Sequence, residues 1–124
     1  MNGTEARGGH VVLDYTGYSP PFEGDGEWML QVLRNCVQRA GVREVHSHVE
    51  QFDGTESPPG FAAVVLIDES HVSAHCYSDS GLLAIDIFTC GGSDPSALAD
   101  DIHREVVKAV PEIELAGRKM LDRF

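Results

Sequence analysis

The chain has 124 residues, of which 42% are hydrophobic, and this suffices for one soluble domain, spanning residues 1–124, with a single core. Its 20 acidic and nine basic side chains give a formal net charge of -11, which disfavours binding to nucleic acid because few groups are present to neutralise phosphates. No apolar run approaches the roughly 20 residues of a membrane span. Residues 1–9 lack the apolar core of a secretory signal, so we expect a cytoplasmic protein without a membrane partner.

The first elements expected along the chain are a strand and an amphipathic helix. The strand covers residues 10–15 and ends in a turn-rich segment. Apolar residues at three- and four-residue spacing then predict a helix over residues 27–40. Asp25 is the expected cap of this helix, and Gly41 is expected to end it.

Four strands are expected in the middle of the chain. Residues 45–52 alternate with a period of two. The side chains on one face of this strand are His46, His48, Glu50 and Phe52. The uninterrupted apolar run over residues 61–67 is typical of a strand buried on both faces. Residues 71–77 and 82–90 then form a hairpin.

A second helix and a last strand complete the pattern. Asp94 and Pro95 predict the helix start, Pro111 requires its end near Val110, and residues 113–120 form the strand. The order β-α-β-β-β-β-α-β predicts an α+β fold, a two-layer sandwich in which both helices pack on one face of an antiparallel or mixed sheet. The other sheet face then remains free for a partner subunit.

The densest group of reactive side chains directly follows the apolar strand, over residues 68–79. Ser70, His75 and Cys90 by themselves suggest a hydrolase, but the chain has no G-x-S-x-G elbow and is short for an α/β-hydrolase. A metal site built on His46, His48 and Glu50 is a second possibility, because these side chains share one strand face. No clear further ligand lies nearby in the sequence, and we assign no metal.

Two segments point to a different chemistry. Residues 69–71, Glu-Ser-His, with His75, and residues 84–91, Ala-Ile-Asp-Ile-Phe-Thr-Cys-Gly, resemble the signature of the small, single-domain bacterial S-adenosylmethionine decarboxylases. The resemblance extends from residues 9–13 to the last strand. It implies a proenzyme that cuts itself between Glu69 and Ser70, into chains 1–69 and 70–124.

The resemblance also implies how the cofactor arises. The Ser70 hydroxyl attacks the Glu69 carbonyl and converts the amide to an ester. Loss of the Ser70 α-proton expels the Glu69 carboxylate and leaves dehydroalanine. Hydrolysis then releases ammonia and leaves a pyruvoyl group at residue 70, which forms a Schiff base with the substrate amine and accepts electrons when CO2 departs.

Further residues take their roles from the same resemblance. His75 matches the base for processing, and an imidazole pKa of about 6.5 suits that task. Cys90 matches the proton donor to the substrate α-carbon. Phe52 matches the aromatic that stacks on adenine, while Tyr77 and Asp79 retain an aromatic face and a carboxylate able to bind ribose. The implied activity is decarboxylation of S-adenosyl-L-methionine to S-adenosylmethioninamine for spermidine biosynthesis, by a homodimer of cut chains.

The chain also departs from the family pattern. Residues 76–79 read Cys-Tyr-Ser-Asp where the family has Thr-Trp-Pro-Glu, and Ala62 stands where the family has a serine that helps processing. Ser57, in the longer loop before the apolar strand, is a candidate for replacing that hydroxyl. Two alternatives therefore stay open: a pyruvoyl-dependent arginine or ornithine decarboxylase, and an uncut regulatory or binding homologue.

The remaining cysteines receive structural assignments. The chain has three cysteines and no CxxC pair, so we expect no disulfide framework. Cys36 lies in the apolar pattern of the first helix and is assigned to the core. Cys76 should face away from His75, because neighbouring side chains of a strand point to opposite faces.

Overall fold

The computed structural model describes residues 7–90 and 93–124, in which six strands and two helices follow one another in the expected order. Gly91, the last residue of the second signature segment, lies outside the described residues. The elements are β1 (Gly8–Thr16), α1 (Asp25–Arg39), β2 (His46–Phe52), β3 (Gly60–Ile67), β4 (Ser70–Tyr77), β5 (Leu82–Cys90), α2 (Pro95–Ala109) and β6 (Glu114–Arg123).

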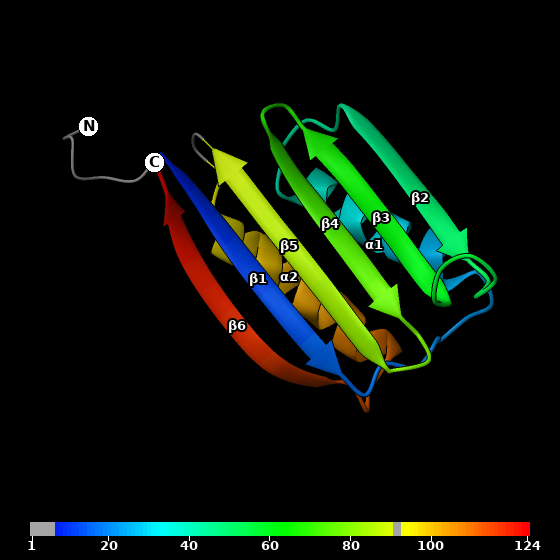
Figure 1. Ribbon diagram of the computed structural model, residues 1–124. Helices are drawn as coiled ribbons and strands as arrows, with labels where there is room; N and C mark the ends of the chain where they lie inside the picture. Colours follow the sequence, from blue (N-terminus) through cyan, green and yellow to red (C-terminus); the bar gives the residue numbers. More distant parts are fainter. Residues whose placement is uncertain (1–6, 91–92) are drawn as a thin grey trace.

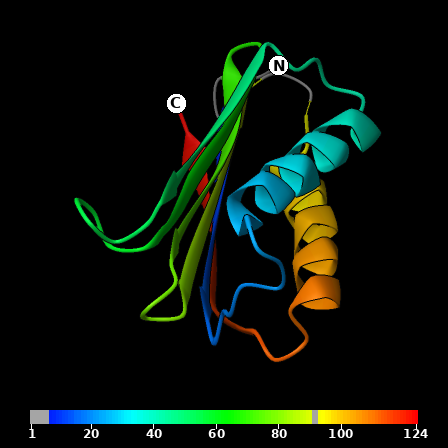
Figure 2. The same ribbon diagram turned by 90° about the vertical axis from the view of Figure 1, so that its right-hand side faces the viewer.

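The strands form one antiparallel sheet in the order β2-β3-β4-β5-β1-β6. Both helices cover the same face of this sheet, and no helix or strand of the described residues covers the opposite face (Figures 1 and 2). The predicted two-layer α+β sandwich is therefore confirmed, with the sheet entirely antiparallel in the described part of the chain. The last strand runs to Arg123, three residues further than predicted, because β6 pairs with the whole of β1.

The core lies between the sheet and the two helices. Leu83, Ile85 and Ile87 of β5 point toward the helices and are at most 1% exposed. Met29 of α1 and Ile102 of α2 belong to the same core cluster and are fully buried. Each such side chain contributes about 1.5–3 kcal/mol through burial. Strand alternation then sends every second side chain of the sheet to the open face.

The expectation that residues 61–67 are buried on both faces is wrong for a single copy of the chain. Phe61, Val65 and Ile67 face the helices and are at most 3% exposed, whereas Leu66 on the other face is 41% exposed. A single copy of the chain therefore leaves apolar side chains of this strand exposed on the open face.

The prediction that Asp25 caps α1 is also wrong. Gly24 occupies the cap position with a φ of 71°, and Asp25 lies inside the first turn, only 5% exposed. Its carboxylate accepts hydrogen bonds from the Tyr18 hydroxyl at 2.6 Å and from the Gln51 amide at 3.1 Å. These bonds tie the start of α1 to the end of β2, so burial of this carboxylate is compensated by polar partners.

The start of α2 is capped as the sequence predicts. The Asp94 carboxylate accepts a hydrogen bond from the Ser96 amide at 2.9 Å, and Pro95 occupies the first turn. We expect Asp94→Ala to lower the free energy of unfolding by about 1 kcal/mol, because one amide at the helix start loses its acceptor. Urea unfolding measures this difference. Asp94→Asn is the control, because asparagine also accepts this hydrogen bond, and it should lower the free energy of unfolding by only a few tenths of that value. An equal loss of stability in both variants would contradict the capping role.

Candidate active site

The two signature segments meet where β4 begins and β5 ends. Ser70 is the first residue of β4, Cys90 is the last residue of β5, and the two strands are antiparallel neighbours. The Cys90 backbone amide donates a hydrogen bond to the Ser70 hydroxyl oxygen at 2.9 Å. Ser70 is buried, while Glu69 before it is exposed. The serine of the expected cut therefore lies beside the backbone of the expected proton donor, whose side chain follows those of Asp86 and Phe88 on the open face.

His75 does not join this pair within one copy of the chain. It lies on β4, five residues after Ser70, which at about 3.3 Å per residue places it about 16 Å further along the strand. The two side chains also point to opposite faces, because Ser70 faces the helix layer and His75 is exposed on the open face. The expected processing base is therefore remote from the Glu69–Ser70 bond in its own chain.

The expected substrate-binding residues gather at the His75 end of the open face. Phe52 and Tyr77 both pair with Gly60, so the two aromatic side chains flank a residue without a side chain. They lie two strands apart, or about 10 Å, which leaves room for a flat ring between them. Asp79 is exposed in the turn that follows Tyr77.

Gly60 is required at the centre of this row. Its φ of 149° is a conformation that residues with side chains rarely adopt, and a Cβ atom there would collide with the Cys76 carbonyl oxygen. The backbone conformation therefore requires glycine at this position, and this keeps the gap between Phe52 and Tyr77 free of a side chain. It lies at the opposite end of β4 from Ser70, a separation of seven residues or about 23 Å.

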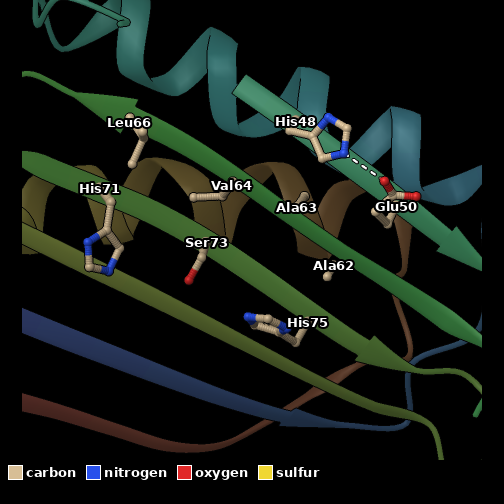
Figure 3. A pocket seen from close by; sticks show the side chains of 9 residues that line it. All are labelled: His48, Glu50, Ala62, Ala63, Val64, Leu66, His71, Ser73 and His75. Atoms are coloured by element: carbon tan, nitrogen blue, oxygen red, sulfur yellow. Dashed lines mark hydrogen bonds and ion pairs between the residues drawn. The ribbon is translucent and has the colours of Figure 1, made fainter. Parts of the chain in front are cut away.

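A shallow hollow of about 430 Å³ lies on the open face between these two ends (Figure 3). Ala62 pairs with Glu50 on one side and His75 on the other, so its small side chain leaves space between them. The hollow is lined by His48, Glu50, Ala62, Ala63, Val64, Leu66, His71, Ser73 and His75.

The hollow includes residues to which sequence reasoning gave no role. Ser73 and His71 lie two and four residues before His75 on the same strand face, and strand alternation is the signal that reveals them. Ser73 places a hydroxyl diagonally across from Ala62. Ser57, in contrast, is exposed in the loop joining β2 and β3, which projects on the open side of the sheet (Figure 2).

His71 packs into an aromatic cluster at the Ser70 end of the open face. Its ring lies 6.5 Å from the His10 ring and 5.6 Å from the Phe88 ring. Burial lowers the pKa of His71 below its usual value, with a smaller lowering from His10 and an opposing effect from Asp86. The imidazole is therefore held neutral more readily than a free histidine.

The two remaining cysteines are placed as expected. Cys36 is fully buried in α1, and Cys76 is 3% exposed on the helix side of β4, facing away from His75. Burial raises the pKa of each thiol to about 12, so both stay protonated. Neither has the properties of a reactive cysteine.

The metal hypothesis gains no support from the geometry. Among residues 7–90 and 93–124, no three histidine, cysteine or acidic side chains are grouped so that they could hold a metal ion. His48 instead bonds to Glu50, with its Nε2 atom 2.8 Å from a carboxylate oxygen (Figure 3). Neither of the two described helices is long and apolar enough to cross a membrane.

Comparison with known proteins decides the family. The sequence model described as S-adenosylmethionine decarboxylase matches residues 9–118. The chain belongs to the S-adenosylmethionine decarboxylase family. A proenzyme of that name from Shouchella clausii is 35% identical over 112 residues, which cover 88% of this chain and 82% of the relative. One from Persephonella marina is 33% identical over 99 residues, covering 80% and 71%.

A solved structure extends the likeness to three dimensions. The adenosylmethionine decarboxylase from Aquifex aeolicus superposes with a TM-score of 0.70 at 25% identity, covering 97% of this chain and 92% of the other. The curated relatives are decarboxylase proenzymes, and this chain is accordingly a decarboxylase.

We expect this decarboxylase to become more stable as the pH rises toward about 6.5. The folded state lowers the pKa of His71, so below that pH the unfolded chain binds more protons and acid favours unfolding. Urea unfolding at several pH values measures the slope, and His71→Asn should flatten it. An NMR titration of the His71 ring checks the cause directly; a midpoint at or above about 6.5 would contradict this explanation.

Proposed function

We propose that this decarboxylase removes CO2 from S-adenosyl-L-methionine with a pyruvoyl group that it makes from Ser70, and that the product, S-adenosylmethioninamine, is used to build spermidine. The hydrogen bond between the Cys90 amide and the Ser70 hydroxyl carries this proposal, because it places a thiol-bearing residue beside the serine to be converted. Ser70 is buried at a strand start, a position that suits a group shielded from bulk water.

In the proposed self-cleavage, the Ser70 oxygen bonds to the Glu69 carbonyl carbon as the amide C–N bond breaks, and the nitrogen gains the hydroxyl proton. A base then takes the Ser70 α-proton, and the Glu69 carboxylate leaves. Addition of water releases ammonia. Once formed, the pyruvoyl group would supply the electron sink for the electron pair left by CO2. Cys90 donates a proton to the substrate α-carbon, and its proximity to residue 70 fits this role.

The proposed site is shared between two copies of the chain. Ser70 and Cys90 lie at one end of β4, and His75, Phe52 and Tyr77 lie at or near the other, so one copy holds two separated halves. A twofold axis that lies between two packed open faces and runs across the strands brings each end of one copy against the opposite end of its partner. Such packing also covers the exposed apolar side chains of β3, which supports a homodimer.

The proposed substrate fits the features of the His75 end. Phe52 and Tyr77 flank Gly60 and offer two faces for stacking on adenine, and such stacking is worth about 1–3 kcal/mol per base. Aromatic faces also attract a sulfonium cation. Asp79 provides an exposed carboxylate for ribose hydroxyls. Arginine and ornithine carry neither adenine nor ribose, so an enzyme for either would not need an adenine platform together with a ribose-binding carboxylate.

The shared site predicts complementation between two inactive chains. Ser70→Ala alone should remain a single chain of 13.5 kDa, and His75→Ala alone should be cut slowly. When the two are expressed together, the mixed dimer contains one intact pair of Ser70 and His75. We therefore expect the His75→Ala chain to be cut into 1–69 and 70–124, which mass spectrometry detects. Absence of cutting in the mixture, with a wild type that is cut, would place His75 in its own chain's site.

Cys90→Ala should separate cleavage from turnover. We expect this variant to be cut normally but to turn over slowly and to lose activity during the reaction, because the substrate α-carbon lacks its proton donor. Release of labelled CO2 over time measures both effects. Cys36→Ala removes a buried thiol from the core and is the control. Normal, sustained turnover in a fully cut Cys90→Ala protein would rule out the assigned role.

Phe52→Ala tests the substrate. With S-adenosylmethionine, we expect kcat/KM to fall by about 5- to 150-fold, the equivalent of about 1–3 kcal/mol of lost stacking. Phe22→Ala, which removes an exposed phenyl ring outside the site, is the control. Labelled CO2 release is compared for S-adenosylmethionine, arginine and ornithine. Preference for either amino acid, with no effect of Phe52→Ala, would refute the nucleoside substrate while leaving the pyruvoyl chemistry in place.

A further inference from the structure

The turn between β3 and β4 contains only two residues, Asp68 and Glu69, because Ile67 pairs directly with Ser70. The bond proposed to be cut, between Glu69 and Ser70, is therefore the bond that joins this turn to β4. Asp68 has a φ of 49°, and Phe124 is the one other non-glycine residue with a positive φ in the described part of the chain. Aspartate tolerates a positive φ better than most residues with a side chain, but only glycine adopts it without a steric penalty, so Asp68 leaves a modest strain in the turn.

Arg43 holds Asp68 from outside the turn. Its Nε and Nη2 atoms both donate to the Asp68 Oδ1 atom, at 3.0 Å and 2.6 Å. Arg43 belongs to the connection between α1 and β2, and the Val45 amide nearby donates to the Leu66 carbonyl oxygen at 2.7 Å. The connection is thereby attached to the end of β3, beside the turn.

We propose that Asp68, held by Arg43, is a positioning residue for self-cleavage. The left-handed conformation raises the free energy of the uncut turn, and the cut after Glu69 opens the turn and releases that strain. The inference rests on the proposed cleavage between Glu69 and Ser70. It attributes part of the rate of self-cleavage to the conformation of this turn. Conversion of an amide to an ester is unfavourable, and it proceeds more readily from a strained starting state.

Two uncharged replacements isolate the strain. Asp68→Asn and Asp68→Gly both remove the carboxylate that Arg43 holds, but glycine adopts a positive φ without a steric penalty. We expect the precursor of Asp68→Gly to persist with a half-time about fivefold longer than that of Asp68→Asn. Freshly translated chains sampled over time on denaturing gels give both half-times. Equal half-times, or faster cutting of the glycine variant, would overturn the proposal.

Thermal unfolding separates strain from a merely structural role. In a Ser70→Ala background, where no chain is cut, the glycine variant should unfold at a higher temperature than the asparagine variant, because its strain is relieved. If strain drives self-cleavage, the glycine variant should be cut more slowly than the asparagine variant and should also be more stable. Slower cutting together with lower stability would mean that the glycine variant only disturbs the fold, and the inference would fail.

A matched pair of arginine variants tests the contact with Arg43. Arg43→Ala should lengthen the precursor half-time about twofold to threefold. Arg34→Ala removes a comparable exposed pair, in which Arg34 donates to Glu44 at 2.8 Å, and should cleave at the wild-type rate. Equal rates of self-cleavage for wild type and Arg43→Ala would show that the contact with Arg43 does not contribute to cleavage. A wild type that is never cut would refute the proposed function and this inference together.

Discussion

The antiparallel register between β4 and β5 is the constraint on which the rest of the site depends. It sets His71 opposite Phe88, and from that register the start of β4 falls beside the end of β5, where Ser70 meets the Cys90 amide. A shift of one residue would exchange the faces of all side chains on one strand. Buried side chains on the helix side resist such a shift, so the core of the sandwich maintains the geometry of the site.

The one-sided helix layer has a second consequence. It leaves an open face that carries Cys90 of β5 near one end of β4 and His75 and Tyr77 near the other, while Ser70 faces the helix layer at the first end. An extended strand cannot fold back to bring its own ends together. Strand length therefore separates the residues of the proposed site within one copy, and this separation is the reason for proposing a site shared by two copies.

Much of this fold follows from local sequence patterns. Alternation correctly placed His46, His48, Glu50 and Phe52 on one face of β2, because side chains along a strand point to opposite sides in turn. The errors arose where tertiary contacts overrode local preference. Asp25 looked like a helix cap, but the Tyr18 hydroxyl and the Gln51 amide, from separate parts of the chain, draw its carboxylate into the helix start.

The sequence by itself determined the order of the elements and the two-layer fold, because periodicity is a local property of the chain. It also predicted roles for Ser70, His75 and Cys90 through the family resemblance. Only the tertiary structure decided which of these residues meet. Cross-strand register depends on turn lengths and on core packing, neither of which can be read from the spacing of residues on one strand. That register joins Ser70 to Cys90, separates both from His75, and places Gly60 between Phe52 and Tyr77.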